Sequence, residues 1–318
     1  MILRPKWLLS VIVLFAIVNV LIFLNRSNRF EYIKHSDIAD LYPDDPGTSF
    51  LNKWNRYNIS FSPAELGQGV SLLRKYTAID SVQDEKDKII RIASWLYKSF
   101  SQQQGIPDAQ LSTLTPLQQY NYLKTQGKSH LWCGHFQRMF GFFCTAAGFQ
   151  NRYIEIVPVN DSVNAGYHEV NEVFLPTTKK WVMVDITRNL FLISKDDQAL
   201  STAAYFNYRL HEQTETLLIT CFENDSILTK SLPKEIFLTD TYFNKNYFLR
   251  YYLNLNLSEV YSPLPKIKRY ILGDPWYEIY SPGLSHSDFL FRVKQFFFFG
   301  FLVSLLMILF YAVKHRKH

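Results

Sequence analysis

Cys133 is the residue of this 318-residue chain whose position most favours nucleophilic chemistry. It follows a polar Gly-Lys-Ser-His loop and opens the segment CGHFQRMFGFFCTAAG, whose Phe136, Phe140, Phe143 and Ala147 recur at helical spacing. Unpaired N–H groups and the positive end of the helix dipole stabilise a thiolate at such a place. They can lower a thiol pKa from about 8.5 to between roughly 4 and 7. A cysteine within a buried helix is more often a small hydrophobic residue, so Cys133 also needs a base and a group to orient that base.

A predicted β-hairpin supplies both groups. The runs Glu169–Leu175 and Trp181–Ile186 are rich in Val, Ile and aromatic residues and are joined by the turn PTTKK. If Leu175 faces Lys180, paired residue numbers sum to 355, and His168 is the diagonal neighbour of Asp185 at roughly 5.5 to 8 Å between α-carbons. Any odd sum keeps the two side chains on one face, whereas an even sum separates them. The spacing therefore permits a His–Asp pair without requiring it.

The elements around these residues predict an α+β domain. An N-cap signature, Ser81 with Asp84, precedes a helix with apolar residues Ile89, Ala93, Leu96 and Phe100, and a shorter helix runs from Thr115 to about Gln126. The helix at Cys133 ends near Gly148, and short strands follow, beginning with Arg152–Val157. Residues 198–210 are expected to be helical, and Leu253–Leu257 alternates as a strand does. Helices followed by an antiparallel sheet are typical of the α+β class.

The stretch WCGHFQRMFGFFCTAAGFQNRYIEI followed by HEVNEVFLPTTKKWVMVDIT resembles the transglutaminase-like superfamily. The matching positions are Cys133, Gly148, Arg152, His168, Asn171, Glu172, Trp181, Asp185 and Thr187, and the resemblance covers roughly residues 85–195. It implies a papain-like α+β core in which a buried helix that opens with the cysteine packs on an antiparallel sheet. It also implies that Cys133 is the nucleophile, His168 the general base and acid, and Asp185 the carboxylate that holds the imidazole tautomer.

These roles indicate amide or peptide hydrolysis, or transamidation, through a thioester on Cys133. The backbone N–H of Cys133 is one expected oxyanion donor, and Trp132 or Gln126 is the candidate for the second. The sequence departs from the animal cross-linking enzymes, which have a Trp after the cysteine, because Gly134 fills that place and Trp132 precedes the cysteine. Cross-linking of glutamine to lysine is therefore not implied.

Two uncharged apolar stretches predict transmembrane helices at the ends of the chain. Trp7–Leu24 and Phe296–Val313 are each long enough to cross a bilayer core, and basic residues flank both. No small-x-small cleavage site follows the first stretch, which favours an uncleaved anchor over a signal peptide. The positive-inside rule weakly favours cytoplasmic termini. We therefore expect a two-pass protein of the cell membrane with an extracytoplasmic catalytic domain and lipid contacts through both helices.

Composition excludes several classes of protein. The chain is 47% hydrophobic and 19% charged, which is unlike a disordered tail. Its formal charge of +6 comes from 34 basic and 28 acidic residues, and 7 of the basic ones lie at the chain ends, which leaves 27 against 28 in the body. The basic residues at the ends are Arg4, Lys6, Arg292, Lys294, Lys314, Arg316 and Lys317. A nucleic-acid surface is therefore not expected, because it would need basic residues clustered in the folded part.

The predicted organisation has five parts. These are a membrane anchor at 1–24, a linker or N-terminal extension at 25–80 wrapped on the surface, a transglutaminase-like domain at 81–213, an aromatic-rich extension at 214–290, and a second membrane helix with a basic tail at 291–318. The aromatic residues after Thr214 are expected to serve core packing and headgroup contact rather than ligand binding. The expected substrates are protein, peptide or cell-wall amides, with no cofactor.

Other interpretations of the same residues remain open. A metal site formed by Cys133, His135 and Cys144 is unfavourable, since the two cysteines lie about 16 Å apart along one helix. Cys144 could pair with Cys221 only if the fold brings them together. A second function, a membrane-anchored scaffold or binding protein of the cell envelope that kept the fold and lost turnover, also fits the sequence.

Several polar residues near the motif are expected to be bystanders. Glu169 should face away from His168, and Glu172, on the same face as His168, should support the hairpin. His35, His130, His135 and His286 are expected on the surface or in loops.

Overall fold

A computed structural model gives the structure of most of the chain. The described residues are 5–24, 34–54, 61–126, 129–159, 167–211, 213, 216–233, 242–253, 264, 271–273, 277–282 and 289–315. The chain divides into two compact units, each described by itself below. One comprises Met1–Lys34, Leu257–Pro275 and Leu284–His318, and the other comprises His35–Asn256 and Trp276–Gly283.

The larger unit begins with helices. They are α2 (Ile38–Leu41), α3 (Thr48–Leu51), α4 (Pro63–Thr77), α5 (Glu85–Phe100), α6 (Pro116–Gln126) and α7 (Cys133–Ala146), with short 3₁₀ turns at Asn52–Trp54, Ile79–Ser81, Ser101–Gln103 and Leu111–Thr113. The carboxylate of Asp84 caps α5 by accepting the N–H of Asp87 at 3.0 Å. Ser81 instead ends a 3₁₀ turn, because Val82 returns to an extended conformation. The prediction of Ser81 as the N-cap is therefore wrong.

Helix α7 ends as its sequence predicts. Gly148 adopts φ +87°, the left-handed conformation that favours glycine. Its N–H donates to the carbonyl of Thr145 at 3.0 Å, and the N–H of Phe149 donates to the carbonyl of Cys144 at 2.9 Å. These two bonds form a Schellman motif, which satisfies carbonyls at the end of the helix.

A six-stranded sheet carries the predicted hairpin. Its strands are β1 (Lys34–His35), β2 (Asn151–Pro158), β3 (His168–Leu175), β4 (Lys180–Val184), β9 (Tyr247–Tyr252) and β10 (Tyr277–Tyr280), in the order β1-β10-β9-β2-β3-β4. Strands β3 and β4 pair antiparallel with Leu175 opposite Lys180 and Asn171 opposite Val184. The predicted register, in which paired numbers sum to 355, is confirmed.

A second, smaller sheet follows. It contains β5 (Leu192–Lys195), β6 (Gln198–Ala199), β7 (Leu218–Glu223) and β8 (Ser226–Ser231), in the order β6-β5-β7-β8. Helix α8 (Thr202–Leu210) starts later than the predicted residue 198, because Ser201 is its N-cap and Gln198 pairs in β6. The strand predicted at Leu253–Leu257 lies outside the described residues except for Leu253, which follows the end of β9.

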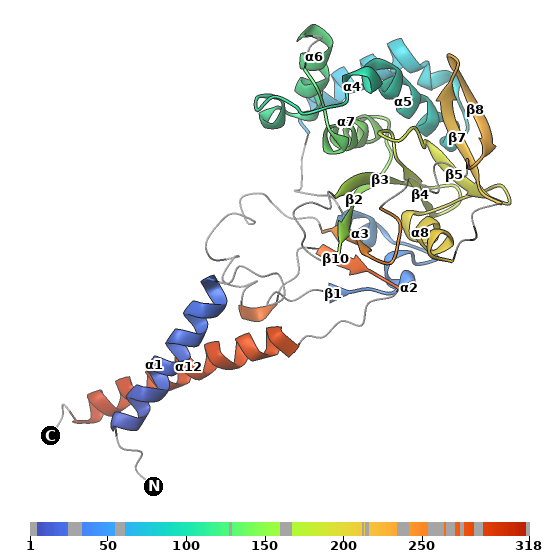
Figure 1. The fold of residues 1–318 in the computed structure, drawn as a ribbon. Helices are drawn as coiled ribbons and strands as arrows, with labels where there is room; N and C mark the ends of the chain where they lie inside the picture. The colour runs from blue at the N-terminus through green and yellow to red at the C-terminus, as the bar shows by residue number, and fades with distance from the viewer. Residues whose placement is uncertain are drawn as a thin grey trace. The chain divides into compact units, whose positions relative to one another are not determined.

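The large sheet has an apolar cluster on each face. Helices α4, α5, α6 and α7 lie on one face and α8 on the other (Figure 1). Odd-numbered residues of β3 such as Val173 pack toward α7, and even-numbered residues such as Val170 pack toward α8. The arrangement of helices on an antiparallel sheet confirms the α+β class.

The segment predicted as a surface linker contributes to the core, and that prediction is wrong. Leu41 and Trp54 are fully buried in the cluster on the α8 face. Strands β9 and β10, from the aromatic-rich region, extend the same sheet, and Leu249 and Tyr251 are also fully buried. Aromatic residues of this region therefore pack in the core, as predicted.

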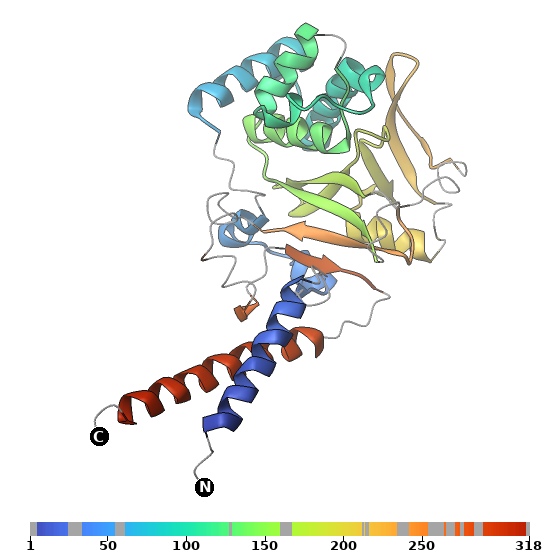
Figure 2. The ribbon, with the colours of Figure 1, turned by 60° about the vertical axis from the view of Figure 1, so that its left-hand side comes forward.

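The smaller unit contains α1 (Pro5–Leu24) and α12 (Phe289–His315), which cross each other (Figure 2). The Phe15 ring makes edge contacts with Phe296 and Phe297 at 6.0 and 5.5 Å between centroids. The side-chain amide of Asn19 donates to the carbonyl of Phe297 at 3.1 Å. A polar side chain therefore joins two helices whose other contacts are largely apolar.

The prediction of two membrane-spanning helices is wrong. Among the described residues, one helix is long and apolar enough to cross a membrane, at Phe289–Val313, and its 25 residues extend about 37 Å. Within α1, the apolar stretch among the described residues is Leu9–Ile22, which is shorter than that in α12.

Candidate active site

Cys133 is the first residue of α7 and is partly exposed. Trp132 is the N-cap residue, with an extended backbone. Its N–H donates to Nδ1 of His135 at 3.3 Å, so the imidazole satisfies a backbone donor where the helix begins. The helix therefore starts at a fixed point, with the thiol of Cys133 in its first turn.

His135 is buried, so its predicted place on the surface or in a loop is wrong. Its Nε2 lies 3.4 Å from the hydroxyl of Ser112. Burial and the nearby charge of Arg138 lower the pKa of His135 to about 4, against a smaller opposing effect of Asp108. The ring is therefore neutral at pH 7, and a neutral Nδ1 can accept the Trp132 N–H. Trp132 and His135 are not the Ser/Thr and Glu/Gln of a capping box, so no sequence signal marked this bond.

Two buried amides join α7 to the sheet one turn beyond Cys133. The Nε2 group of Gln137 donates to the carbonyl of Val170 at 2.6 Å, and the Nδ2 group of Asn171 donates to the carbonyl of Gln137 at 3.2 Å. Both residues are almost fully buried. These bonds fix the start of α7 relative to β3, the strand that begins with His168.

His168 and Asp185 meet on one face of the sheet. Nε2 of His168 lies 2.6 Å from Oδ2 of Asp185, and the two residues are 4% and 1% exposed. The other carboxylate oxygen accepts the N–H of Arg188 at 3.2 Å, and backbone bonds of 2.8 Å join Asp185 to Leu190 in both directions. Because Asp185 is held on both sides, it fixes the orientation of the imidazole.

The charge of this pair favours a protonated imidazole. Burial alone lowers the pKa of His168, but the negative charge and hydrogen bond of Asp185 outweigh it, and Cys133 adds in the same direction, so that the pKa rises to about 10. Nε2 bonds to Asp185, which leaves Nδ1 for Cys133. The structure thus brings together Cys133, His168 and Asp185, the three residues predicted from sequence.

Part of the chain matches a known family. Residues 74–186 match the profile of the Transglutaminase-like superfamily. The chain contains a transglutaminase-like domain. Its structure is also similar to a crystal structure of a candidate cysteine protease from Cytophaga hutchinsonii, with a TM-score of 0.32 and 16% sequence identity. That similarity covers 51% of this chain and 47% of the other, so the chain spans about half the length of that protein. No curated protein matches.

The transglutaminase-like domain has little room for a side chain directly after its cysteine. A Cβ added to Gly134 would lie 2.6 Å from Oε2 of Glu169. Glu169 therefore faces α7, on the opposite face of the strand from His168, as predicted. A side chain at position 134 would therefore require the carboxylate end of Glu169 to move.

Glu172 does more than support the hairpin. Its Oε2 lies 2.7 Å from Nε and 2.6 Å from Nη2 of Arg152, and both residues are fully buried. Its Oε1 accepts the hydroxyl of Tyr42 at 2.7 Å and the N–H of Thr202 at 2.6 Å. The resemblance marked Arg152 and Glu172 as motif positions, and the structure joins them in one buried ion pair.

The second oxyanion donor remains a prediction. The backbone N–H of Trp132 is already donated to His135, so that group is engaged, while its side chain is 54% exposed. The side chain of Gln126, the other candidate, lies outside the described residues, although its backbone ends α6.

The remaining cysteines and histidines lie away from these roles. All three cysteines are free thiols, so Cys144 and Cys221 do not form a disulfide. Within the described ranges, no group of three or more His, Cys, Asp or Glu side chains is placed to hold a metal ion. His130 is exposed, as predicted, His35 is half-buried, and His286 lies outside the described residues.

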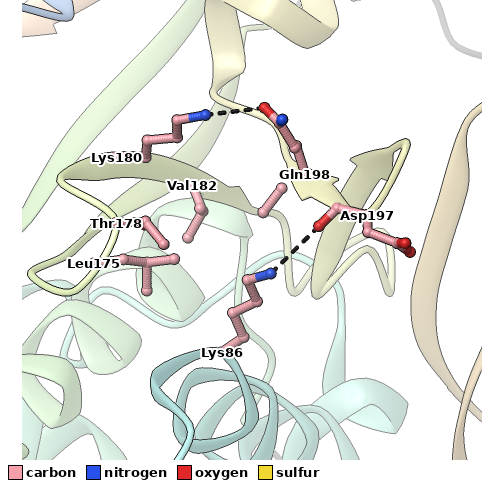
Figure 3. Close-up of a pocket in the computed structure, with 8 residues that line it drawn as sticks. Lys86, Leu175, Thr178, Lys180, Val182, Asp197 and Gln198 are labelled. Atoms are coloured by element: carbon pink, nitrogen blue, oxygen red, sulfur yellow. Dashed lines mark hydrogen bonds between the residues drawn. The ribbon is translucent and has the colours of Figure 1, made fainter. Parts of the chain in front are cut away.

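A pocket of about 220 Å³ lies at the other end of the hairpin (Figure 3). Leu175 and Val182 line it, and Lys86 and Lys180 donate to the carbonyl of Asp197 and to Oε1 of Gln198 at 3.4 and 2.9 Å. Seven residue steps of β3 separate Leu175 from His168, about 23 Å along the strand. This pocket is therefore separate from the candidate triad.

Proposed function

We propose that this chain is a cysteine-nucleophile acyl-transfer enzyme that acts on amide or peptide bonds. The observation that supports the proposal most is the buried hydrogen bond of 2.6 Å between His168 and Asp185. The imidazole of His168 also interacts with Cys133. A partly exposed thiol next to an oriented imidazole is the arrangement that activates a nucleophile. A purely structural role would not need the thiol at that place.

The proposed reaction has two steps. The thiolate of Cys133 attacks the acyl carbon, the carbon–nitrogen bond breaks, and the imidazolium of His168 gives its proton to the leaving amine. Neutral His168 then takes a proton from water or from a second amine, which attacks the thioester and releases the acid or a new amide. Asp185 keeps Nδ1 directed at the sulfur and stabilises the imidazolium in both steps.

The proposal includes an anchor and a class of substrate. Helix α12 would hold the enzyme at a membrane, with the transglutaminase-like domain on the extracytoplasmic side. Protein, peptide or cell-wall amides would be the substrates, because each offers an acyl carbon joined to a leaving amine.

Acylation of Cys133 by a simple activated ester tests the proposal. We expect the full-length protein in detergent to release p-nitrophenolate from p-nitrophenyl acetate in a burst equal to its concentration, and peptide mapping to find the acetyl group on Cys133. The Cys133→Ser and His168→Ala variants should lose the burst. Cys221→Ser, which removes a buried free thiol elsewhere, should keep it. Equally slow acetylation of Cys133 in the wild type and in His168→Ala would instead support a catalytically silent scaffold.

A further inference from the structure

An aromatic ring from outside the family match covers the catalytic imidazole. The rings of His168 and Tyr242 are stacked, with centroids 5.0 Å apart and planes inclined by 22°. Tyr242 follows the last residue of the matched region, 186, by 56 positions (242 − 186). The match to the transglutaminase-like profile ends before Tyr242, so it gives no reason to place this residue at the site.

The surroundings of Tyr242 hold its ring in place. The next residue, Phe243, is almost fully buried and contacts the rings of Tyr205 and Phe206 in α8 at 4.8 and 6.0 Å. Tyr242 itself makes an edge contact of 5.8 Å with Tyr247, where β9 begins. The contacts of Phe243 with α8 therefore hold the backbone next to Tyr242, and the contact with Tyr247 holds the ring of Tyr242.

A stacked aromatic ring has two physical effects on a protonated histidine that is bonded to a carboxylate. Its electron-rich face attracts an imidazolium, which the carboxylate of Asp185 already favours. It also excludes water from one face of the imidazole, and a hydrogen bond to a carboxylate is stronger where water is excluded. His168 is the first residue of β3 and 4% exposed, so a cover over its ring has a direct effect on access by water.

We propose that Tyr242 is a positioning residue, supplied by the C-terminal extension, that holds the His168 imidazole against Asp185 and keeps water from their hydrogen bond. This inference rests on the proposed function, because positioning matters only if His168 takes part in catalysis. It assigns the region after residue 214 a part in the active site, in addition to its part in the core.

The low-field proton resonance of the His168–Asp185 hydrogen bond tests the inference without any turnover. Such a resonance is observed only while the proton is protected from exchange with water. We expect it in the wild type and in Tyr242→Phe, which keeps the ring face. It should disappear in Tyr242→Ala and in Tyr242→Leu, which retains apolar contact but has no ring. His168→Ala identifies the signal by removing it.

A matched control is available in another stacked pair. Tyr76 stacks on Trp95 with centroids 5.7 Å apart and planes inclined by 12°, and Tyr76 is 48% exposed. Tyr76→Ala should keep the low-field resonance. In the ester assay, Tyr242→Ala should lower kcat about 10²-fold, with KM changed by less than about threefold, and Tyr242→Phe should stay close to the wild type.

Two outcomes would overturn the inference. In one, Tyr242→Ala and Tyr242→Leu keep the resonance and kcat. In the other, Tyr242→Phe behaves like Tyr242→Ala, which would assign the effect to the hydroxyl group. If Cys133 is never acylated, the proposed function fails while the resonance still reports on the position of His168. If acylation is normal and the resonance does not depend on Tyr242, only the present inference fails.

Discussion

Replacing Glu172 by glutamine tests what balances the buried charge of Arg152. The guanidinium carbon lies 4.2 to 5.0 Å from the centroids of four aromatic rings, and Arg152 also donates to the carbonyl of Leu41 at 3.0 Å. The rings belong to Tyr42, Trp54, Trp181 and Tyr251. Both the rings and the carboxylate could offset the charge. Glu172→Gln removes the negative charge and turns one of the two accepting oxygens into an NH2 group that faces a donor.

The expected loss of stability differs according to whether the carboxylate of Glu172 or the aromatic rings offset the charge of Arg152. Breaking a fully buried ion pair costs about 3–5 kcal/mol, because the remaining charge is left without compensation. If the rings alone offset the charge, each contributing about 0.5–2 kcal/mol, they would still be present in the variant and little stability would be lost. Because Glu172 is fully buried and contacts Arg152 at 2.6 and 2.7 Å, we expect the free energy of unfolding to fall by about 3–5 kcal/mol.

Urea unfolding followed by tryptophan fluorescence measures this change, since Trp54 and Trp181 lie beside Arg152. Glu223→Gln makes the same substitution in an exposed ion pair with Lys230 and should cost less than about 1 kcal/mol. Adding Arg152→Met to Glu172→Gln should recover part of the loss, because no unpaired charge then remains buried. A loss below about 1 kcal/mol for Glu172→Gln alone would refute the reasoning and assign the charge to the rings.

Two further predictions concern α7 and pH. Gly141→Ala should lower the free energy of unfolding in urea by about 1–3 kcal/mol, because the new Cβ would lie 2.9 Å from the rigid ring of Tyr153. Gly134→Ala meets only the flexible end of Glu169 and should lower it by less than about 1 kcal/mol. Equal losses in the two variants would contradict this prediction. The free energy of unfolding should fall as pH drops from about 6.5 toward 4, because in that range His135 binds a proton only in the unfolded chain. It should also fall as pH rises from about 6.5 toward 10, because in that range His168 holds a proton only in the folded chain. His135→Gln should flatten the acid side and His168→Ala the alkaline side by up to about 1.4 kcal/mol per pH unit, and unchanged slopes would contradict the assignments.

The local parts of the fold could be predicted from sequence because short-range rules determine them. The four-residue turn between Leu175 and Lys180 sets the register of the hairpin, and that register puts His168 and Asp185 on one face. Apolar spacing and Gly148 likewise set the limits of α7. In these cases the residues that decide the structure lie within a few positions of the element they decide.

The errors concern contacts between distant segments. Nothing in the local sequence shows that Leu41 and Trp54 are buried, because what buries them is a cluster of residues from β2, β9 and α8. His135 has no partner pattern in the sequence and is therefore predicted on the surface or in a loop, yet it is buried, with Ser112 and Trp132 as its partners.

The boundaries of the family match do not coincide with the boundaries of the site. Arg152 lies within the matched residues, but the carbonyl of Leu41 and the ring of Tyr251 that contact it lie before and after them. His168 likewise lies within the match, whereas Tyr242, which covers its ring, does not. Arg152 and His168 therefore both contact segments outside the match, and parts of both extensions belong to the same compact unit as the candidate triad.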